Sequence, residues 1–376
     1  MIKFDDVTKK YPDGTVAVDT LSLVAPSGQI TVFVGPSGCG KTTSLRMINR
    51  MIEPSSGTIW MDDQDTGKVA PATLRRGIGY VIQHAGLFPH RTILDNIITV
   101  PSLLGQDKKK ARTRAMELME RVGLEARFAG RYPAQLSGGQ QQRVGVARAL
   151  AADPPVMLMD EPFSAVDPVV REQLQQEFLR LQSELGKTIV FVTHDIDEAI
   201  KLGDQVAVLN VGGILAQLAS PAELLSRPAN AFVAGFVGRD RGYRALGFET
   251  DTVPLRTEPT VALGGTVADA VRVAEDGWVL VVDTGNSPQG WLNVNHGSYD
   301  GTTLIAPALL NLGGTLATEG GTLRNTLDAA LSSPSGRGVV VDDASKLLGT
   351  VTTADVVARI EAKAAAARAV EPAVRG

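Results

Sequence analysis

Eight residues near the N-terminus have the spacing of a phosphate-binding loop, G-x-x-x-x-G-K-[S/T]. They read Gly35-Pro36-Ser37-Gly38-Cys39-Gly40-Lys41-Thr42. The apolar run Ile30–Val34 precedes them and a helical pattern follows, so backbone N–H groups and the start of a helix would face phosphate oxygens. We expect Lys41 to reach the β- and γ-phosphates of a bound nucleotide and the Thr42 hydroxyl to ligate Mg²⁺. The alternative, a chance glycine turn before a helix, is disfavoured by this context.

An apolar strand that ends in two carboxylates supplies a second set of reactive groups. The run Val156–Met159 is followed by Asp160 and Glu161. If this strand lies beside the phosphate loop, Asp160 comes near Mg²⁺ and Glu161 faces the γ-phosphate, where it would polarise the attacking water. Acidic residues also end strands simply because solvent begins there, so this interpretation depends on the loop upstream.

Two further polar residues follow apolar runs. Gln83 comes after Ile78–Ile82, and His194 comes after Thr188–Thr193. Because the carboxyl ends of parallel strands are where α/β sheets bind ligands, both side chains are candidates for the same site. The alternative for His194 is a solvated loop histidine.

These residues lie far apart in the sequence, so a sheet must bring them together. Over roughly the first 240 residues, apolar runs typical of buried strands alternate with helical patterns, which predicts α/β architecture. The expected strands include Ile30–Val34, Ile78–Ile82, Val156–Met159, Thr188–Val192 and Gln205–Leu209. The expected helices include Lys41–Met51, Lys109–Val122 and Val170–Leu185.

The composition is that of a globular protein and excludes several classes of function. The 376 residues are 44% hydrophobic and 21% charged, enough for two or three domains with a sizeable core. The single cysteine, Cys39, cannot form an internal disulfide, which fits a reducing compartment, and we expect it to serve as a small residue. The uncharged stretches Thr20–Gly40 and Gly301–Thr318 are broken by Gly, Pro, Ser and Thr, so any membrane role must come through a partner. Neither half has a basic surface, so we expect no nucleic-acid partner.

The last third of the chain contains a weak internal repeat. Residues 241–258 mix charge, Gly and Pro without periodicity, and we expect a linker there between a domain at 1–240 and a smaller one at 259–376. The two copies of the repeat begin at Gly265 and Gly321, and each has a helical pattern, a strand, an Asp and a Gly seven residues later. Such β-α-β-β units are too short to bury their own faces, so we expect them to pack on each other.

One further segment resembles the signature motif of ATP-binding cassette (ABC) proteins. It reads Leu136-Ser137-Gly138-Gly139-Gln140, followed by Gln141-Gln142-Arg143. The phosphate loop through Thr43, then Gln83, Asp160-Glu161, Asp167 and His194 follow the family's order, and Tyr11 sits where the family places an aromatic residue that stacks on adenine. The likeness covers about residues 1–240. It implies a P-loop ABC fold with a RecA-like core and a helical subdomain, ATP hydrolysis, and ATP and Mg²⁺ as cofactors.

The resemblance also assigns roles to these residues. Two copies of the chain would pair head to tail as a homodimer around two ATP molecules, each site taking Ser137, Gly138, Gly139 and Gln140 from the second copy. Asp167 would lie at the dimer seam. Gln83 would sense the γ-phosphate and the Mg²⁺ that Thr42 and Asp160 hold, while Glu161 and His194 would position the attacking water.

Within the family, residues 76–97 and 229–240 look like those of uptake systems for osmoprotectants and quaternary amines (glycine betaine, choline, carnitine, proline betaine). This implies a membrane permease and an extracytoplasmic solute-binding protein as partners, and a place at the cytoplasmic face of the inner membrane. Uptake of another amine or an amino acid stays open, because the cassette never touches the solute. A soluble ABC ATPase of DNA repair or translation is disfavoured by the single cassette without sustained heptads, and a sensor without turnover by Glu161.

The repeat after residue 250 resembles a tandem cystathionine-β-synthase (CBS) module, an α+β domain attached to many such cassettes. Residues 349–355 nearly match that family's ribose-contacting pattern, which implies an adenosine-type nucleotide at Thr352 and Asp355. The first copy has Asn293 and His296 at the corresponding positions. A purely structural pairing domain is an equal alternative. The acidic balance of residues 251–376, 14 acidic and 9 basic side chains, argues against regulation through anionic lipid.

Overall fold

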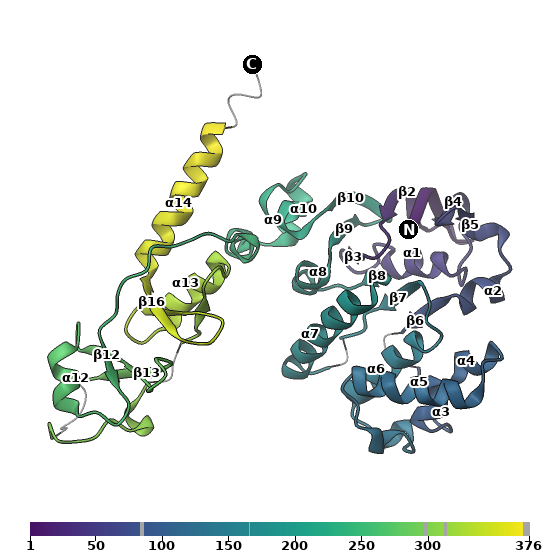
Figure 1. Ribbon diagram of the computed structural model, residues 1–376. Coiled ribbons are helices and arrows are strands. Elements are labelled where there is room, and N and C mark those ends of the chain that lie inside the picture. Colours follow the sequence, from purple (N-terminus) through teal and green to yellow (C-terminus); the bar gives the residue numbers. More distant parts are fainter. Residues whose placement is uncertain (83–85, 165, 296–299, 312–313, 371–376) are drawn as a thin grey trace. The chain divides into compact units, whose positions relative to one another are not determined.

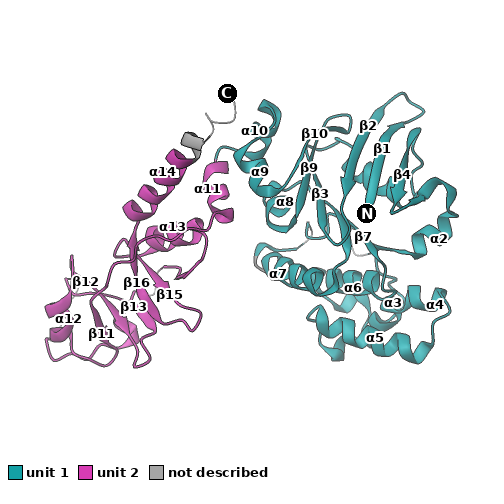
Figure 2. Ribbon diagram, turned by 45° about the horizontal axis from the view of Figure 1, so that its top comes forward, with its two compact units in different colours: residues 1–239 teal, residues 240–376 magenta. Residues whose placement is uncertain are grey.

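The computed structural model describes residues 1–82, 86–164, 166–295, 300–311 and 314–370. The chain folds as two compact units, residues 1–239 and 240–376 (Figure 2). None of the helices in these described ranges is both long enough and apolar enough to cross a bilayer.

Unit 1 contains two sheets. The antiparallel sheet has the order β2-β1-β4-β5 and the second sheet has the order β10-β9-β3-β8-β7-β6, in which only β10 runs antiparallel to its neighbour. The first sheet consists of β1 (Ile2–Lys10), β2 (Val16–Ala25), β4 (Ser56–Met61) and β5 (Gln64–Asp65). The second consists of β3 (Ile30–Val34), β6 (Ile78–Val81), β7 (Val156–Asp160), β8 (Thr188–Val192), β9 (Gln205–Asn210) and β10 (Ile214–Ala219).

The parallel strands are continuous apolar runs because helices and the first sheet cover both faces of their sheet. Every residue of β3, β7 and β8 is buried, as expected for parallel strands covered on both sides. The main core lies between the two sheets, where the rings of Phe4 and Phe33 meet edge to face with centroids 6.0 Å apart. The predicted α/β architecture of this region is therefore confirmed, with strand bounds within one residue of those expected.

The helices of unit 1 fall into two groups. One group flanks the sheets: α1 (Lys41–Ile48), α2 (Pro71–Arg76), α7 (Pro168–Leu185), α8 (Ile196–Leu202), α9 (Pro221–Ser226) and α10 (Ala231–Val237). The other is a helical segment inserted between β6 and β7: α3 (Ile93–Ile97), α4 (Thr99–Leu103), α5 (Lys108–Arg121) and α6 (Gly138–Leu150), which lie together in Figure 1. Helix α1 ends three residues earlier than expected, because Arg50 turns the chain with φ +55° and donates to the carbonyls of Thr66, Gly67 and Val69.

The internal repeat of unit 2 is confirmed. Each copy forms a three-stranded sheet in which the first strand pairs parallel and the third antiparallel to the middle strand. The first copy is β11 (Thr260–Ala262), α12 (Val267–Val273), β12 (Trp278–Val282) and β13 (Pro288–Asn293). The second is β14 (Ala317–Thr318), α13 (Leu323–Ser332), β15 (Arg337–Val341) and β16 (Leu347–Thr352), followed by α14 (Thr353–Val370). The copies pack through a shared cluster that includes Leu280, Trp291 and Val339.

The two copies also exchange their entry segments. The backbone of Arg256, ahead of the first copy, exchanges hydrogen bonds of 2.8 and 2.9 Å with Thr350 in β16. Asn311, ahead of the second copy, does the same with Trp291 in β13, at 2.8 and 3.0 Å. The reciprocal pairing explains why neither copy is an independent unit.

The expected linker at 241–258 is folded. It contains α11 (Arg241–Ala245), and the side chains of Leu246 and Val253 belong to the core of unit 2 beside α13 and α14. The boundary between the units therefore lies at residues 239/240. No sequence pattern indicates this, because a few isolated apolar residues are enough to dock a segment without creating a periodic pattern.

Candidate functional site

The loop between β3 and α1 has a backbone that only glycine can adopt at two positions. Gly40, the residue before α1, has φ +86°, and a Cβ atom there would lie 2.2 Å from the carbonyl oxygen of Ala17. A Cβ atom on Gly35 would lie 2.2 Å from the carbonyl oxygen of Leu209. No side chain caps α1, so the N–H groups of its first turn are available for an anion.

Lys41 is held inside this loop. Its side chain is buried, and the ammonium group donates to the carbonyl oxygens of Gly35 at 2.7 Å and Pro36 at 3.0 Å. Cys39 lies beneath the ammonium, with its sulfur 3.7 Å away, and burial raises the pKa of its thiol. The thiol is thus packed rather than reactive, in agreement with the expectation that a small residue is needed there.

Thr42 and Asp160 come together at the start of α1 and the end of β7. The Thr42 hydroxyl donates to Asp160 Oδ1 at 3.0 Å, and a guanidinium nitrogen of Arg46 lies 3.8 Å from Asp160 Oδ2. Burial raises the pKa of Asp160, while the Thr42 hydroxyl and the Arg46 charge lower it. A hydroxyl and a carboxylate in contact are hard oxygen ligands of the kind that Mg²⁺ prefers, so the site fits this ion.

Glu161 and His194 follow the neighbouring strands β7 and β8. Glu161 Oε1 lies 3.1 Å from His194 Nδ1. The backbone of Glu161 has φ +46° and is fixed by hydrogen bonds from its N–H to the Val192 carbonyl and from the Ser164 N–H and hydroxyl to its own carbonyl. A strained, well-anchored backbone turns this carboxylate away from its strand and toward the histidine.

Lys41, Thr42, Glu161 and His194 border one cavity of ≈ 500 Å³, whereas Asp160 and Arg46 lie behind Thr42 and are not among its lining residues. Its lining residues are Ala17, Ser37, Gly38, Cys39, Gly40, Lys41, Thr42, Thr43, Glu161 and His194. The volume suits a nucleotide, and the combination of backbone donors, a lysine and a carboxylate is suited to binding and cleaving a phosphate chain. The carboxyl-end residues of β3, β7 and β8 meet here because those strands are adjacent and in register.

Other expected site residues lie elsewhere. Tyr11 is at the turn after β1, on the same hairpin as Ala17, with the Lys9 ammonium 5.3 Å from its ring centroid, and it is not among the cavity's lining residues. Ser137 begins α6, where its hydroxyl accepts from the Gln140 N–H at 3.3 Å and its own N–H donates to Gln140 Oε1 at 3.0 Å. Asp167 is exposed just before α7. Gln83 lies outside the described residues.

Two neighbours of the site were missed by the sequence reasoning. Arg46 follows Thr42 by four residues on α1, so helical periodicity was a usable signal that both face Asp160. Ala17 reaches the cavity because the β1–β2 hairpin packs over the phosphate loop. Nothing in the sequence around Ala17 indicates that contact.

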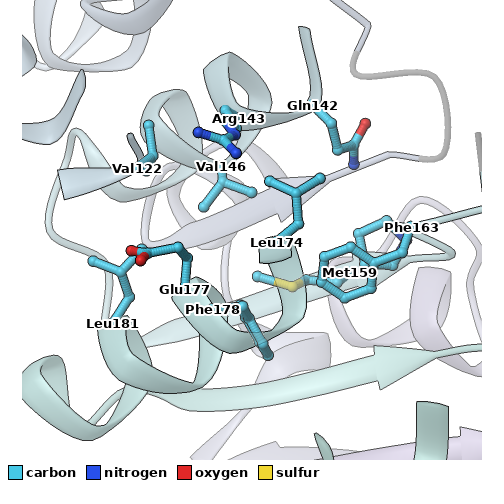
Figure 3. Close-up of a pocket in the computed structure, with 11 residues that line it drawn as sticks. Val122, Gln142, Arg143, Val146, Met159, Phe163, Leu174, Glu177, Phe178 and Leu181 are labelled. Carbon is cyan, nitrogen blue, oxygen red and sulfur yellow. The ribbon is translucent and has the colours of Figure 1, made fainter. Parts of the chain in front are cut away.

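A smaller pocket of ≈ 30 Å³ lies between α6 and α7, behind β7 (Figure 3). Apolar side chains from both helices and from β7 line it, including Val146, Met159, Leu174 and Phe178. Its volume is that of roughly one methyl group or one water molecule. It is a packing void along the seam between the inserted helical segment and the sheet, separate from the phosphate cavity.

Comparison with known proteins identifies the family. The model of the ABC transporter family matches residues 18–164. The osmoprotectant import ATP-binding protein OsmV of Salmonella typhimurium is 50% identical over 306 residues, which cover 78% of this chain and 79% of OsmV. This chain belongs to the ATP-binding subunits of ABC transporters. The carnitine transport ATP-binding protein OpuCA of Listeria monocytogenes is 44% identical over 363 residues, covering 95% of this chain and 91% of OpuCA.

Solved structures agree with this assignment for the first unit. The dimeric post-hydrolysis state of the ATP-binding cassette MJ0796, bound to ADP and Pi, is 35% identical, with a TM-score of 0.54 and coverage of 59% of this chain and 99% of that chain. The fold is therefore the P-loop ABC fold predicted from the sequence. The chain is an ATPase.

Proposed function

We propose that this ABC ATPase energises the uptake of a quaternary-amine osmoprotectant, such as glycine betaine, choline, carnitine or proline betaine, through a separate membrane permease. The observation that carries the proposal is the extent of the likeness. The relatives OsmV and OpuCA are named for osmoprotectant import and carnitine transport, and the similarity to OpuCA runs through 95% of this chain, both units included. In this proposal the chain lies at the cytoplasmic face of the inner membrane, bound to a transmembrane permease, and an extracytoplasmic solute-binding protein completes the system.

Hydrolysis uses the groups around the phosphate cavity. Lys41 and the N–H groups of the loop bind the β- and γ-phosphates, and Tyr11 stacks on adenine from the adjacent hairpin. Glu161 takes the proton of the attacking water, and His194, 3.1 Å from that carboxylate, holds the γ-phosphate and helps to place the water. Thr42, Asp160 and Gln83 hold Mg²⁺, which neutralises charge on the phosphates when bound.

Two copies of the chain complete each site. The Ser137 hydroxyl accepts from its own helix but keeps its proton, so that Ser137 and the N–H groups of Gly138 and Gly139 can grip the γ-phosphate bound to the other copy. Gln140 borders this contact and braces Ser137 through its side chain. Asp167, exposed between Glu161 and α7, lies at the seam. The solved MJ0796 cassette is likewise a dimer, which supports this arrangement.

Unit 2 is, in this proposal, a tandem CBS module with a regulatory or pairing role. An adenosine-type nucleotide at Thr352 and Asp355 has a competitor within the chain, because the Arg256 guanidinium donates to both carboxylate oxygens of Asp355, at 3.0 and 3.1 Å. Titration of the full chain with AMP and with adenosine, beside an Arg256→Ala variant, tests this: tighter binding by the variant supports a nucleotide site, and no binding by either supports the pairing role.

The transport proposal is tested by reconstitution. The chain is assembled in liposomes with its permease and solute-binding protein, and ATP-dependent uptake of labelled glycine betaine, choline, carnitine, proline betaine and histidine is compared. Uptake of at least one quaternary amine in preference to histidine is the expected result. Preference for the amino acid, or ATP turnover without any uptake, would refute the proposed substrate class.

A further inference from the structure

A buried carboxylate lies directly behind His194. Glu198, on α8, is 7% exposed, in contrast to the half-buried Asp195 and the exposed Asp197, which lie at the start of the same helix. Burial raises the pKa of Glu198, opposed mainly by the hydrogen bond from Thr193. An acidic group is expensive to bury, so its position requires partners that make specific use of its two oxygens.

One oxygen of Glu198 fixes the turn that carries His194. The hydroxyl of Thr193 donates to Glu198 Oε2 at 2.7 Å and accepts from the N–H of Asp195 at 3.0 Å. The residues before and after His194 are therefore joined through a single hydroxyl that Glu198 orients. The N–H of Thr193 donates to Phe33 in β3, which anchors the turn to the sheet.

The other oxygen of Glu198 reaches α7, the helix that follows Asp167. The side-chain amide of Gln175 donates to Glu198 Oε1 at 3.3 Å, and both residues are buried. One turn earlier, Arg171 donates from its guanidinium to the Val166 carbonyl at 3.1 Å and from its N–H to the Asp167 carbonyl at 2.8 Å. The positive charge of Arg171 also acts on Glu198. The link from the His194 turn to the segment that carries Asp167 thus runs through the buried Thr193–Glu198–Gln175 hydrogen bonds and then along one turn of α7 to the half-buried Arg171.

We propose that Glu198 is a positioning residue for hydrolysis, which holds the His194 turn through Thr193 and couples it to the Asp167 segment through Gln175 and Arg171. This inference rests on the proposed role of His194 in holding the γ-phosphate. Glu198 touches neither substrate nor reacting atoms. Its contribution is to keep the imidazole 3.1 Å from Glu161 while the seam residues respond to the second copy of the chain.

A second link between the same two helices provides the matched control. The Lys201 ammonium on α8 lies 3.1 Å from Glu172 Oε1 on α7, and both side chains reach the surface. If Glu198 merely joined α7 to α8, losing Glu172 would have consequences of the same kind. If Glu198 positions His194, only the buried contacts affect the rate.

The experiment measures kcat and KM for MgATP, together with the Tm, for the full chain and five variants. Thr193→Val keeps the shape and removes the hydroxyl, and we expect kcat to fall at least 10-fold with KM within 2-fold. Thr193→Ser restores the hydroxyl and should return kcat to within 3-fold of the original chain. Glu198→Ala should lower kcat to the same extent as Thr193→Val. The variant that combines Thr193→Val with Glu198→Ala should have a kcat no lower than that of Glu198→Ala alone. Glu172→Ala should keep kcat within 2-fold.

The outcomes separate this proposal from a structural role. A lowered Tm with unchanged kcat in Thr193→Val, or losses that multiply in the double variant, would overturn it. Because Thr193→Val is nearly isosteric, the test stands even if Glu198→Ala does not fold. A His194→Ala variant distinguishes the two levels of inference: an unchanged kcat there refutes the role of His194 itself, whereas a large loss beside a normal Thr193→Val refutes only the positioning by Glu198.

Discussion

A threonine–aspartate pair occurs in each unit, with similar local chemistry and different surroundings. In unit 1 the Thr42 hydroxyl donates to Asp160 Oδ1 at 3.0 Å, and in unit 2 the Thr352 hydroxyl donates to Asp355 Oδ2 at 2.6 Å. Asp160 adjoins the loop that borders a ≈ 500 Å³ cavity, and its nearest cation, on Arg46, stands 3.8 Å away. Both oxygens of Asp355 already accept from Arg256.

The difference shows what makes such a pair a binding site. Burial raises the pKa of Asp160, so the carboxylate gains by meeting a cation, whereas hydrogen bonds from the Arg256 guanidinium and from Thr352 together lower the pKa of Asp355 to about 2. A carboxylate whose charge is already neutralised by its own chain has little left to offer a ligand. The spacing of a motif therefore predicts where its residues lie. Whether they bind a ligand depends on whether their oxygens still lack partners and face an open cavity.

The largest expected effect concerns Glu161, the carboxylate assigned to the attacking water. Glu161→Gln keeps the size of the side chain and removes the base, so turnover should fall by about 10²- to 10⁴-fold while ATP affinity is retained. Steady-state hydrolysis and the mass of the ATP-bound species check this, and a trapped dimer is expected. Asp343→Asn, at an exposed turn in unit 2, is the control. Normal hydrolysis by Glu161→Gln would show that Glu161 is not the base that takes the proton of the attacking water.

Lys41 tests the phosphate loop. Lys41→Ala removes a charge-assisted contact worth about 1.5–3 kcal/mol, so ATP affinity should fall about 10- to 160-fold. Equilibrium binding of a fluorescent ATP analogue measures the change. Lys68→Ala removes a lysine whose side chain is 83% exposed and should bind ATP as the original chain does. Equal affinities for all three proteins would contradict the loop assignment.

Two glycines of the same loop distinguish backbone strain from a steric clash of an added Cβ atom. Both Gly38 and Gly40 have positive φ, but a Cβ atom meets nothing within 4 Å at Gly38 and lies 2.2 Å from the Ala17 carbonyl at Gly40. Gly40→Ala should therefore cost about 1–3 kcal/mol more unfolding free energy than Gly38→Ala. Denaturant unfolding of both variants measures the difference. Equal losses of unfolding free energy would show that the β1–β2 hairpin moves aside for the Cβ atom at position 40 without destabilising the fold.

Acid titration tests the ion pair between Arg256 and Asp355 in unit 2. Because the folded pKa of Asp355 is about 2, below the reference of 3.8, its contribution to stability is present above pH 4 and is lost as the pH falls toward 2. Arg256 is 57% exposed, so we expect no more than about 1 kcal/mol. Asp355→Asn should unfold with a smaller loss of Tm between pH 5 and pH 3 than the original chain. An identical loss would show that the pair adds nothing.

The smallest expected effect concerns the void between α6 and α7, which, unlike the phosphate cavity, can be filled. Val146→Ile adds one methyl group to a space of ≈ 30 Å³ and should stabilise unit 1 by up to about 0.8 kcal/mol. Val144→Ile, on the same helix but fully buried, should instead destabilise by about 1 kcal/mol or more. The Tm values of the two variants should therefore move in opposite directions, and shifts of the same sign would contradict the void.

Much of the fold was predictable because its signals are local. Uninterrupted apolar runs identified β3, β7 and β8, since strands covered on both faces need no polar alternation. The repeat of unit 2 was visible in paired glycines and aspartates, whereas the folded segment at 241–258 was not. Gln83 and His296 lie outside the described residues, so their placement stays a prediction.

Local sequence was enough to specify the phosphate loop, because glycine spacing and a following helix dictate where backbone N–H groups can point. It also placed Asp160, Glu161 and His194 at strand ends. Three contacts became visible in the folded chain alone: Ala17 closes over the loop, Glu198 lies behind His194, and Arg256 binds Asp355 across 99 residues of sequence. The reason is physical: backbone conformation follows from neighbouring residues, whereas the pairing of buried and charged side chains depends on which distant segments pack together.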